Sequence, residues 1–336
     1  MASFLIRRLL TLIPVLLLVL VISFSLVHLI PGDPAVTMLG SGATNEQIEA
    51  LRSQLDLDRP LVVQFFDYVG GVLHGDLGTS LRTGDPVATE IANRLPATME
   101  LAISALALAI IIGIPIGVLA AIRPNTFIDH ALRIGSLLGI SVPAFLLALV
   151  LQLVFANWLG WLPVSGRQDA VVGATSVTGF AVLDGVLTGS VAAVQNALRH
   201  LVLPAMVLAA FLAATIGRYV RATMLDTLGE DYIRTATAKG MRPRTVVINH
   251  GLRNSLLPTV TVVGLQFADM LGGAILTETV FSWPGIGRYM YDAIAHRDYP
   301  VIQGTTLVFA LIFLCTSIIV DVAYGILDPR VRRKVG

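Results

Sequence analysis

The stretch Leu101-Ala-Ile-Ser-Ala-Leu-Ala-Leu-Ala-Ile-Ile-Ile-Gly-Ile-Pro-Ile-Gly-Val-Leu-Ala-Ala-Ile122 decides the class of fold, because it holds 22 residues and no charge. About 20 helical residues are needed to cross the roughly 30 Å hydrocarbon core of a bilayer. A backbone in lipid must also satisfy its polar groups internally, which a helix does by itself. The stretch therefore predicts a transmembrane helix.

Five more long apolar runs flank this stretch, and only one of them contains a charge. They are Leu9–Ile30, Ile134–Ala156, Leu201–Gly217, Leu256–Leu276 and Val301–Val320. The composition agrees, since 13% of the residues are charged, whereas soluble domains carry about a quarter. We predict an all-α, polytopic membrane protein with about six transmembrane helices. Its first run is longer than the apolar core of a signal peptide, so we expect that helix to be retained.

The basic residues predict the orientation of the chain. With six spans and Arg7 inside, the inner segments hold fifteen of the 23 Lys and Arg residues, which is the positive-inside distribution. A seventh span at Ala170–Leu198 would place Arg218–Arg253 and the basic tail Arg330–Lys334 on opposite sides. We therefore predict six spans with both termini in the cytoplasm.

The connections between the runs predict the organisation of the chain. Residues 1–30 form a cytoplasmic N-terminus and the first helix, and residues 31–97 form an external loop with short helices. Thr44 and Gln47 in this loop have the spacing of a helix-capping box. Residues 98–325 form the helical core, which includes a cytoplasmic loop at 218–255, and residues 326–336 form a basic cytoplasmic tail.

The cytoplasmic loop carries the signals of a helix, a turn and a second helix. Glu230 and Asp231 place negative charge where a helix start favours it, and the helix is expected to run to Lys239. Gly240 is the residue type that most often follows a helix end, and Pro243 suits the first turn of the next helix. The small residues of the first helix would let another protein approach its backbone closely.

Within this loop, Arg234-Thr235-Ala236 followed by Gly240 resembles the Glu-Ala-Ala and Gly motif of ABC importer permeases. Arg234 replaces the glutamate of that motif, and Pro258 lies farther from the glycine than in the sugar permeases. Both departures fit the dipeptide, oligopeptide and nickel branch, whose loop is similar to Asp231-Tyr232-Ile-Arg-Thr-Ala with Ala238-Lys239-Gly240.

Five other segments resemble the same branch, in the same order along the chain. They are Pro31-Gly-Asp-Pro34, His74-Gly-Asp-Leu-Gly78, Pro163-Val-Ser-Gly-Arg167, Thr277-Glu-Thr-Val-Phe-Ser-Trp-Pro-Gly-Ile-Gly287, and Asp321-Val-Ala-Tyr324 with Asp328-Pro-Arg330. Their joint pattern is most similar to the dipeptide permeases. The resemblance implies a type I ABC importer permease fold in a bacterial inner membrane.

The resemblance also implies how the chain works and with what. The loop residues Asp231, Tyr232, Arg234, Thr235, Ala236, Lys239 and Gly240 would dock on an ATPase and couple it to the membrane helices. The alternative is a solvated basic loop that only sets the topology. The implied partners are a second, homologous permease, two ATPase subunits, an external substrate-binding protein, the lipid bilayer and a peptide, with no nucleic acid.

Catalytic chemistry is not expected in this chain. It contains no Gly-x-x-x-x-Gly-Lys-Ser/Thr motif, so ATP and Mg²⁺ would be bound by the partner subunits and this chain would bind no cofactor or metal. Dipeptides or short peptides are the expected cargo, with nickel chelates, glutathione and haem as alternatives. A secondary transporter, and a channel or membrane scaffold, are the alternatives from other classes.

Four residues are candidates for the translocation path or its gate. Asp269 lies within an apolar run, where it either meets the ammonium group of the substrate or bonds to the neighbouring permease or to Ser and Thr hydroxyls. The resemblance suggests that Glu278, Trp283 and Pro284 belong to an outer gate. The alternative is an interfacial turn with Trp283 in the aromatic belt of the membrane.

The glycines Gly113 and Gly117 have the spacing that permits close helix packing in membranes. We expect Pro115 between them to bend their helix.

Overall fold

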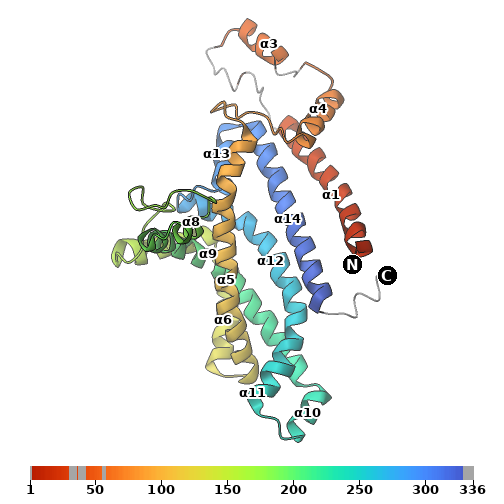
Figure 1. Ribbon diagram of the computed structural model, residues 1–336, viewed down its shortest axis with the longest axis vertical. Coiled ribbons are helices and arrows are strands. Elements are labelled where there is room, and N and C mark those ends of the chain that lie inside the picture. Colours follow the sequence, from red (N-terminus) through yellow and green to blue (C-terminus); the bar gives the residue numbers. More distant parts are fainter. Residues whose placement is uncertain (1, 30–35, 37–42, 55–57, 328–336) are drawn as a thin grey trace. The chain divides into compact units, whose positions relative to one another are not determined.

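The computed structural model describes residues 2–29, 36, 43–54 and 58–327. Apart from an isolated bridge between Thr79 and Pro86, these residues form helices, turns and loops, which confirms the all-α prediction. The helices, shown in Figure 1, are α1 (Ala2–Leu29), α3 (Asn45–Gln54), α4 (Leu61–Leu73), α5 (Val87–Ile122), α6 (Phe127–Ser141), α7 (Ala144–Leu151), the π-helix η1 (Gln152–Trp158), α8 (Ala181–Leu187), α9 (Val191–Leu228), α10 (Asp231–Ala238), α11 (Pro243–Thr245), the π-helix η2 (Val246–Leu252), α12 (Arg253–Val280), α13 (Ile286–His296) and α14 (Tyr299–Leu327).

Four helices of the described chain are long and apolar enough to cross a membrane. They lie in α5, α9, α12 and α14 and contain four of the predicted runs. The first predicted run is helical as far as Leu29, within α1, and Ile30 lies outside the described residues. The described part of the chain therefore supports a polytopic helical protein.

The predicted third span, Ile134–Ala156, is not one helix. The helix α6 ends at Ser141, and α7 begins at Ala144 after Pro143, whose backbone is extended (φ −58°, ψ 137°). A proline lacks the N–H of a helical bond and disfavours helical backbone at the residue before it, here Val142. The proline therefore divides the apolar run.

The external loop that we predicted at 31–97 ends earlier in the structure. The helix α5 begins at Val87, so the expected boundary falls inside a helix. Glu90 lies in the first turn of α5 and pairs with Arg94 one turn later, at 2.6 Å, which supports a helix start here. The short helices α3 and α4 are present, and the capping box is confirmed, because the Thr44 N–H donates to Gln47 Oε1 at 3.0 Å.

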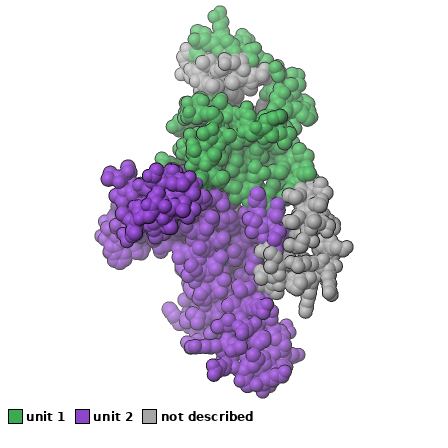
Figure 2. Space-filling view, in the orientation of Figure 1, with its two compact units in different colours: residues 1–96, 285–314 green, residues 97–284, 315–336 purple. Residues whose placement is uncertain are grey.

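The chain divides into two compact units, coloured in Figure 2. Unit 1 contains residues 1–96 and 285–314, and unit 2 contains residues 97–284 and 315–336. The core of unit 1 brings together α5, α13 and α14 through Val87, Ile91, Ile286, Ala293 and Val301. Residues 285–314 of the predicted core 98–325 therefore belong to unit 1, together with the N-terminal part of the chain.

Unit 2 is built around α9, which contacts α6, α7, α8 and α12 and buries most of its apolar stretch. The predicted close packing at the α5 glycines is confirmed. A Cβ on Gly113 would lie 2.7 Å from the Ala213 carbonyl oxygen, and one on Gly117 would lie 2.6 Å from that of Gly217. The two glycines therefore allow the backbones of α5 and α9 to approach closely.

The predicted alternative of a seventh span is not supported. Residues 170–198 contain the short helix α8 and the first residues of α9, with a turn between them. Gly189 in this turn has φ +68°, which a continuous helix cannot contain.

Candidate functional site

The coupling segment, which we define as residues 229–252, has the predicted order of helix, turn and helix. The helix α10 follows Glu230, whose backbone is extended, and ends with Lys239 as its C-terminal cap. Gly240 then adopts φ +77°, a conformation that favours glycine. Pro243 occupies the start of α11, as the sequence predicted. The local signals of this segment therefore suffice to form it.

Most of the predicted coupling residues lie on the surface of unit 2. Exposed members of the set are Asp231, Tyr232, Arg234, Thr235, Lys239 and Gly240. Ala236 is instead buried with Ile233 and Val246 in a small apolar cluster against Leu228. It lies three residues after Ile233, so both face η2 from one side of α10. Its small size serves this internal contact.

One hydrogen bond connects the coupling segment to α12, and another connects α12 directly to α9. The Asn254 amide of α12 donates to the Tyr232 hydroxyl of α10 at 2.8 Å. The Ser255 hydroxyl of α12 contacts the Thr227 hydroxyl of α9 at 3.2 Å. A force applied to α10 can therefore reach α9 along the chain and α12 through the Tyr232 hydroxyl.

The candidate gate residues gather at the other end of α12. Glu278 is fully buried and accepts a hydrogen bond from the Thr98 hydroxyl at 2.7 Å. The Trp283 indole is also buried, and its N–H donates to the Ala97 carbonyl at 2.9 Å. Trp283 therefore packs inside unit 2, and the alternative that placed it in the aromatic belt is wrong. Pro284, the fourth candidate, is exposed.

An ion pair that the sequence did not predict lies beside Trp283. Arg167 binds the buried carboxylate of Glu100 through Nε at 3.0 Å and Nη2 at 2.5 Å. Nη2 of Arg167 also donates to the Gly179 carbonyl, and its guanidinium lies 5.8 Å from the centre of the Trp283 ring. The Val182 N–H donates to the second oxygen of Glu100 at 2.8 Å. Arg167 ends the segment Pro163–Arg167, which resembles the peptide permeases, but nothing in the sequence paired it with Glu100.

Asp184 holds the loop that reaches Arg167. Its carboxylate accepts hydrogen bonds from the backbone N–H groups of Val177, Thr178 and Gly179 and from the Thr178 hydroxyl, at 2.6–3.2 Å. Burial alone would raise the pKa of Asp184, but these four hydrogen bonds outweigh it and lower that pKa below its ordinary value. Asp184 is therefore an ionised anchor for residues 177–179.

Asp269 lies within the apolar part of α12 and is exposed on the surface of the chain. No hydrogen bond or ion pair joins its carboxylate to the described part of the chain. A charge at this depth of a membrane is costly and requires water or a partner. The Ser and Thr hydroxyls of the described chain do not supply that partner.

The comparison with protein families assigns the chain to a class. Residues 113–333 match the family described as the binding-protein-dependent transport system inner membrane component, and residues 1–102 match the family of its N-terminal part. The chain belongs to this family. It is a multi-pass inner-membrane permease subunit and not a catalytic enzyme.

Proteins named as transport permeases match essentially the whole chain. The dipeptide transport system permease protein DppB of Alkalihalophilus pseudofirmus is 46% identical over 99% of this chain and 100% of its own length. The di/tripeptide transport system permease protein of Pseudomonas aeruginosa is 45% identical, over 99% and 100%. The glutathione transport system permease protein of Escherichia coli is 42% identical, over 99% and 100%.

A solved structure supports the fold. A chain from the MetNI methionine ABC transporter in inward-facing conformations matches with a TM-score of 0.51 and 16% identity. The match covers 69% of this chain and 93% of that one. This likeness is evidence for the ABC transporter permease fold alone.

Proposed function

We propose that this chain is the permease subunit of an ATP-driven importer for dipeptides and short peptides. The observation that carries the proposal is the identity of 43–46% to dipeptide transport permeases along essentially the whole chain. In the assembled importer, the chain pairs with a second, homologous permease. Two ATPase subunits bind ATP and Mg²⁺, and an external binding protein delivers the peptide.

The exposed coupling segment is the proposed docking site for an ATPase. Closure of the ATPases around ATP moves α10, and that movement enters α9 directly and α12 through Tyr232 and Asn254. The path then opens outward to accept the peptide, and hydrolysis returns it to the inward state. The residues that contact the ATPase are those that remain exposed on α10 and the turn after it.

The two ends of α12 fit the proposed orientation. A helix of 28 residues spans about 42 Å, which exceeds the roughly 30 Å core of a membrane. The coupling segment adjoins one end of α12, and Glu278 and Trp283 adjoin the other. We place the coupling segment and both termini in the cytoplasm, and Trp283 at the outer side, where it shapes the gate.

Asp269 is proposed to face the translocation path between the two permeases. Its exposed carboxylate lies in the apolar middle of α12, and it would bind the α-ammonium group of a peptide there. Replacement by Asn should reduce peptide uptake and leave assembly intact. Normal uptake by that variant would contradict a role of Asp269 in the path.

A second candidate cargo is glutathione, because a glutathione transport permease is 42% identical over the same length. Glutathione is itself a short peptide, so the proposed path suits it as well. The two cargoes are distinguished by competition, in which unlabelled glutathione is added to an uptake assay with a labelled dipeptide.

The test is uptake of a labelled dipeptide by cells that lack this chain and receive either the wild type or Gly240→Glu. The variant should insert in the membrane and lose most uptake, because a charged side chain would protrude at the docking turn. Nothing lies within 4 Å of a Cβ at Gly240, so the substitution leaves the packing of unit 2 undisturbed.

Gly84→Glu is the matched control, because Gly84 has the same φ of +77° and equally open surroundings. It introduces the same charge and the same backbone strain outside the coupling segment. Uptake that is lost in both variants, or in neither, would contradict coupling through Gly240. Absence of uptake with the wild type would contradict a dipeptide cargo.

A further inference from the structure

Unit 2 contains a buried carboxylate that joins two helices near the coupling segment. Asp129, in the first turn of α6, has no exposed side-chain surface. Arg221 of α9 binds both its oxygens, through Nε to Oδ1 and through Nη2 to Oδ2 at 3.0 Å. Arg133 of α6 binds the same two oxygens at 3.1 and 2.6 Å, and the Asn125 N–H donates at 2.9 Å.

The carboxylate is held in its charged form. Hydrogen bonds from Arg221, then from Arg133, keep the pKa of Asp129 well below its ordinary range, although burial alone would raise it. The two arginines differ in what they join. Arg133 is half-exposed and belongs to the same helix as Asp129, whereas Arg221 is mostly buried and belongs to another helix. Of these two arginine contacts, only that of Arg221 links α6 to α9.

Two further contacts continue this link along the helices. A Cβ on Gly217 of α9 would lie 2.9 Å from Leu132 Cδ1 of α6, so the two helices meet closely there. One turn on, the Ser136 hydroxyl bonds to the Leu132 carbonyl at 2.7 Å and to the Ala214 carbonyl of α9 at 3.2 Å. These contacts attach α6 to α9 over about two turns.

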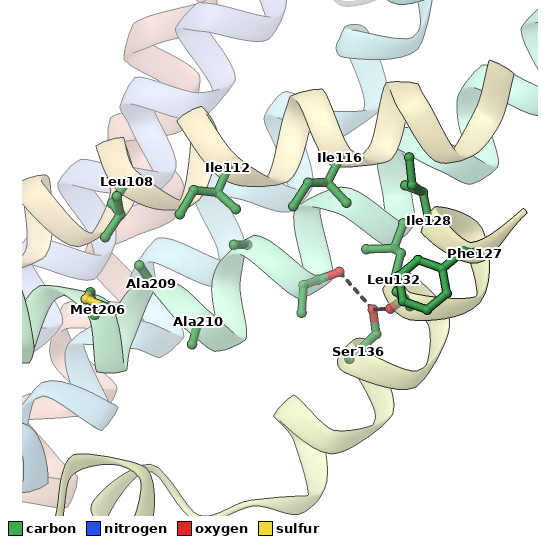
Figure 3. Close-up of a pocket in the computed structure, with 14 residues that line it drawn as sticks. Leu108, Ile112, Ile116, Phe127, Ile128, Leu132, Ser136, Met206, Ala209 and Ala210 are labelled. Carbon is green, nitrogen blue, oxygen red and sulfur yellow. Dashed lines mark hydrogen bonds between the residues drawn. The ribbon is translucent and has the colours of Figure 1, made fainter. Parts of the chain in front are cut away.

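On its other side, α6 faces a groove instead of a helix. Leu108, Ile112 and Ile116 of α5 form one wall, Phe127, Ile128 and Leu132 of α6 form the other, and Met206, Ala209 and Ala210 of α9 form the floor (Figure 3). The groove has a volume of about 470 Å³ and separates α5 from α6. The first half of α6 is therefore held by its contacts with α9 and by the turn 123–126 that joins it to α5.

Arg221 also lies close to the coupling segment. It precedes Leu228, the last residue of α9, by seven residues, or about 10 Å of helix. We propose that Asp129 and Arg221 form a positioning pair that carries movement of the coupling segment through α9 to α6, so that ATP hydrolysis drives transport. This proposal rests on the proposed function. The groove leaves space beside α6 into which this helix can move.

The test measures ATP hydrolysis and peptide uptake on the same purified complex, with its ATPases and binding protein, in proteoliposomes. Arg221→Gln should keep peptide-stimulated ATP hydrolysis within about twofold and reduce the peptide imported per ATP by about tenfold. A merely structural role would lower the amount of complex and leave the ratio unchanged. An unchanged ratio would therefore overturn the proposal.

Arg133→Gln is the matched control, because it removes the other partner of the same carboxylate and keeps the link between the helices. We expect its ratio of uptake to hydrolysis to stay near that of the wild type. An equal loss in both arginine variants would assign the effect to the charge of Asp129 and would overturn the role of the link.

The double variant Asp129→Asn/Arg221→Gln should import as much peptide per ATP as Arg221→Gln alone, since the two substitutions remove the same contact. A further fall of this ratio in the double variant would show that the two residues act independently and would contradict a pair. If Arg221→Gln fails to assemble, Arg221→Lys takes its place, because it keeps the charge and loses the two-point contact. Its ratio should fall by an intermediate amount, and a wild-type ratio would overturn the proposal. Absence of uptake in the wild-type complex would contradict the proposed function instead.

Discussion

The two ends of α12 are built in opposite ways. At one end, the coupling segment exposes its charged residues and buries only a small cluster around Ile233. At the other end lies a group that we call the Trp283 shell, which consists of Ala97, Thr98, Glu100, Arg167, Glu278 and Trp283. The charged groups of the shell lie away from solvent and find their hydrogen-bond and ion-pair partners within unit 2.

The two ends differ in how firmly unit 2 holds them. Few buried apolar contacts give a segment low local stability, and such segments are suited to move or to bind. A buried, fully paired polar network makes a segment rigid. The coupling segment is therefore the less firmly held end, as the proposed docking of an ATPase requires, and the Trp283 shell is the end whose shape the chain itself maintains.

The largest expected effect comes from breaking the shell at its ion pair. Arg167→Ala leaves the Glu100 carboxylate buried without its cation, which costs about 3–5 kcal/mol of stability. Thermal unfolding of the purified chain in detergent measures the loss. Glu100→Gln/Arg167→Met is the control, because it removes both charges and should be less destabilised than Arg167→Ala. A small effect of Arg167→Ala would show that the shell is hydrated and not rigid.

A smaller effect is expected from acid, through the loop that reaches the shell. The pKa of Asp184 is lower in the folded chain than its ordinary value of 3.8, so its stabilisation is complete above that value. The stabilisation is lost as the pH falls through the lower, folded pKa.

Asp184→Asn should be less stable than the wild type at neutral pH, by about 1–3 kcal/mol. The difference between the two should shrink below pH 3.8, as unfolding measured at several pH values would reveal. A constant difference would show that Asp184 does not titrate with folding.

The smallest effect on stability is expected in the coupling segment, where the Arg234 side chain is 76% exposed. Its pair with Asp231 lies in solvent at 3.3 Å, so Arg234→Ala should change stability by less than about 0.5 kcal/mol. The same variant should still lower binding of the ATPase subunits, measured by co-purification of the complex. A large loss of stability in the isolated chain would remove the contrast between the two ends.

The structure also explains which predictions from the sequence were correct. The turn at Gly240 and Pro243 was predicted because both residues act on their own backbone. The packing at Gly113 and Gly117 was predicted from their spacing on one helix. The third apolar run is not one continuous helix as we expected, because the run was weighed without the break at Pro143.

The sequence by itself determined the class of the protein, its apolar helices and the form of the coupling segment, because these follow from residues that are close along the chain. The distant partners of Glu100, Glu278 and Asp129 follow instead from the tertiary structure. Their hydrogen-bond partners Arg167, Thr98 and Arg221 lie 67, 180 and 92 residues away. No local pattern predicts such pairs, since a side chain finds its partner only after the helices have packed and removed both from water.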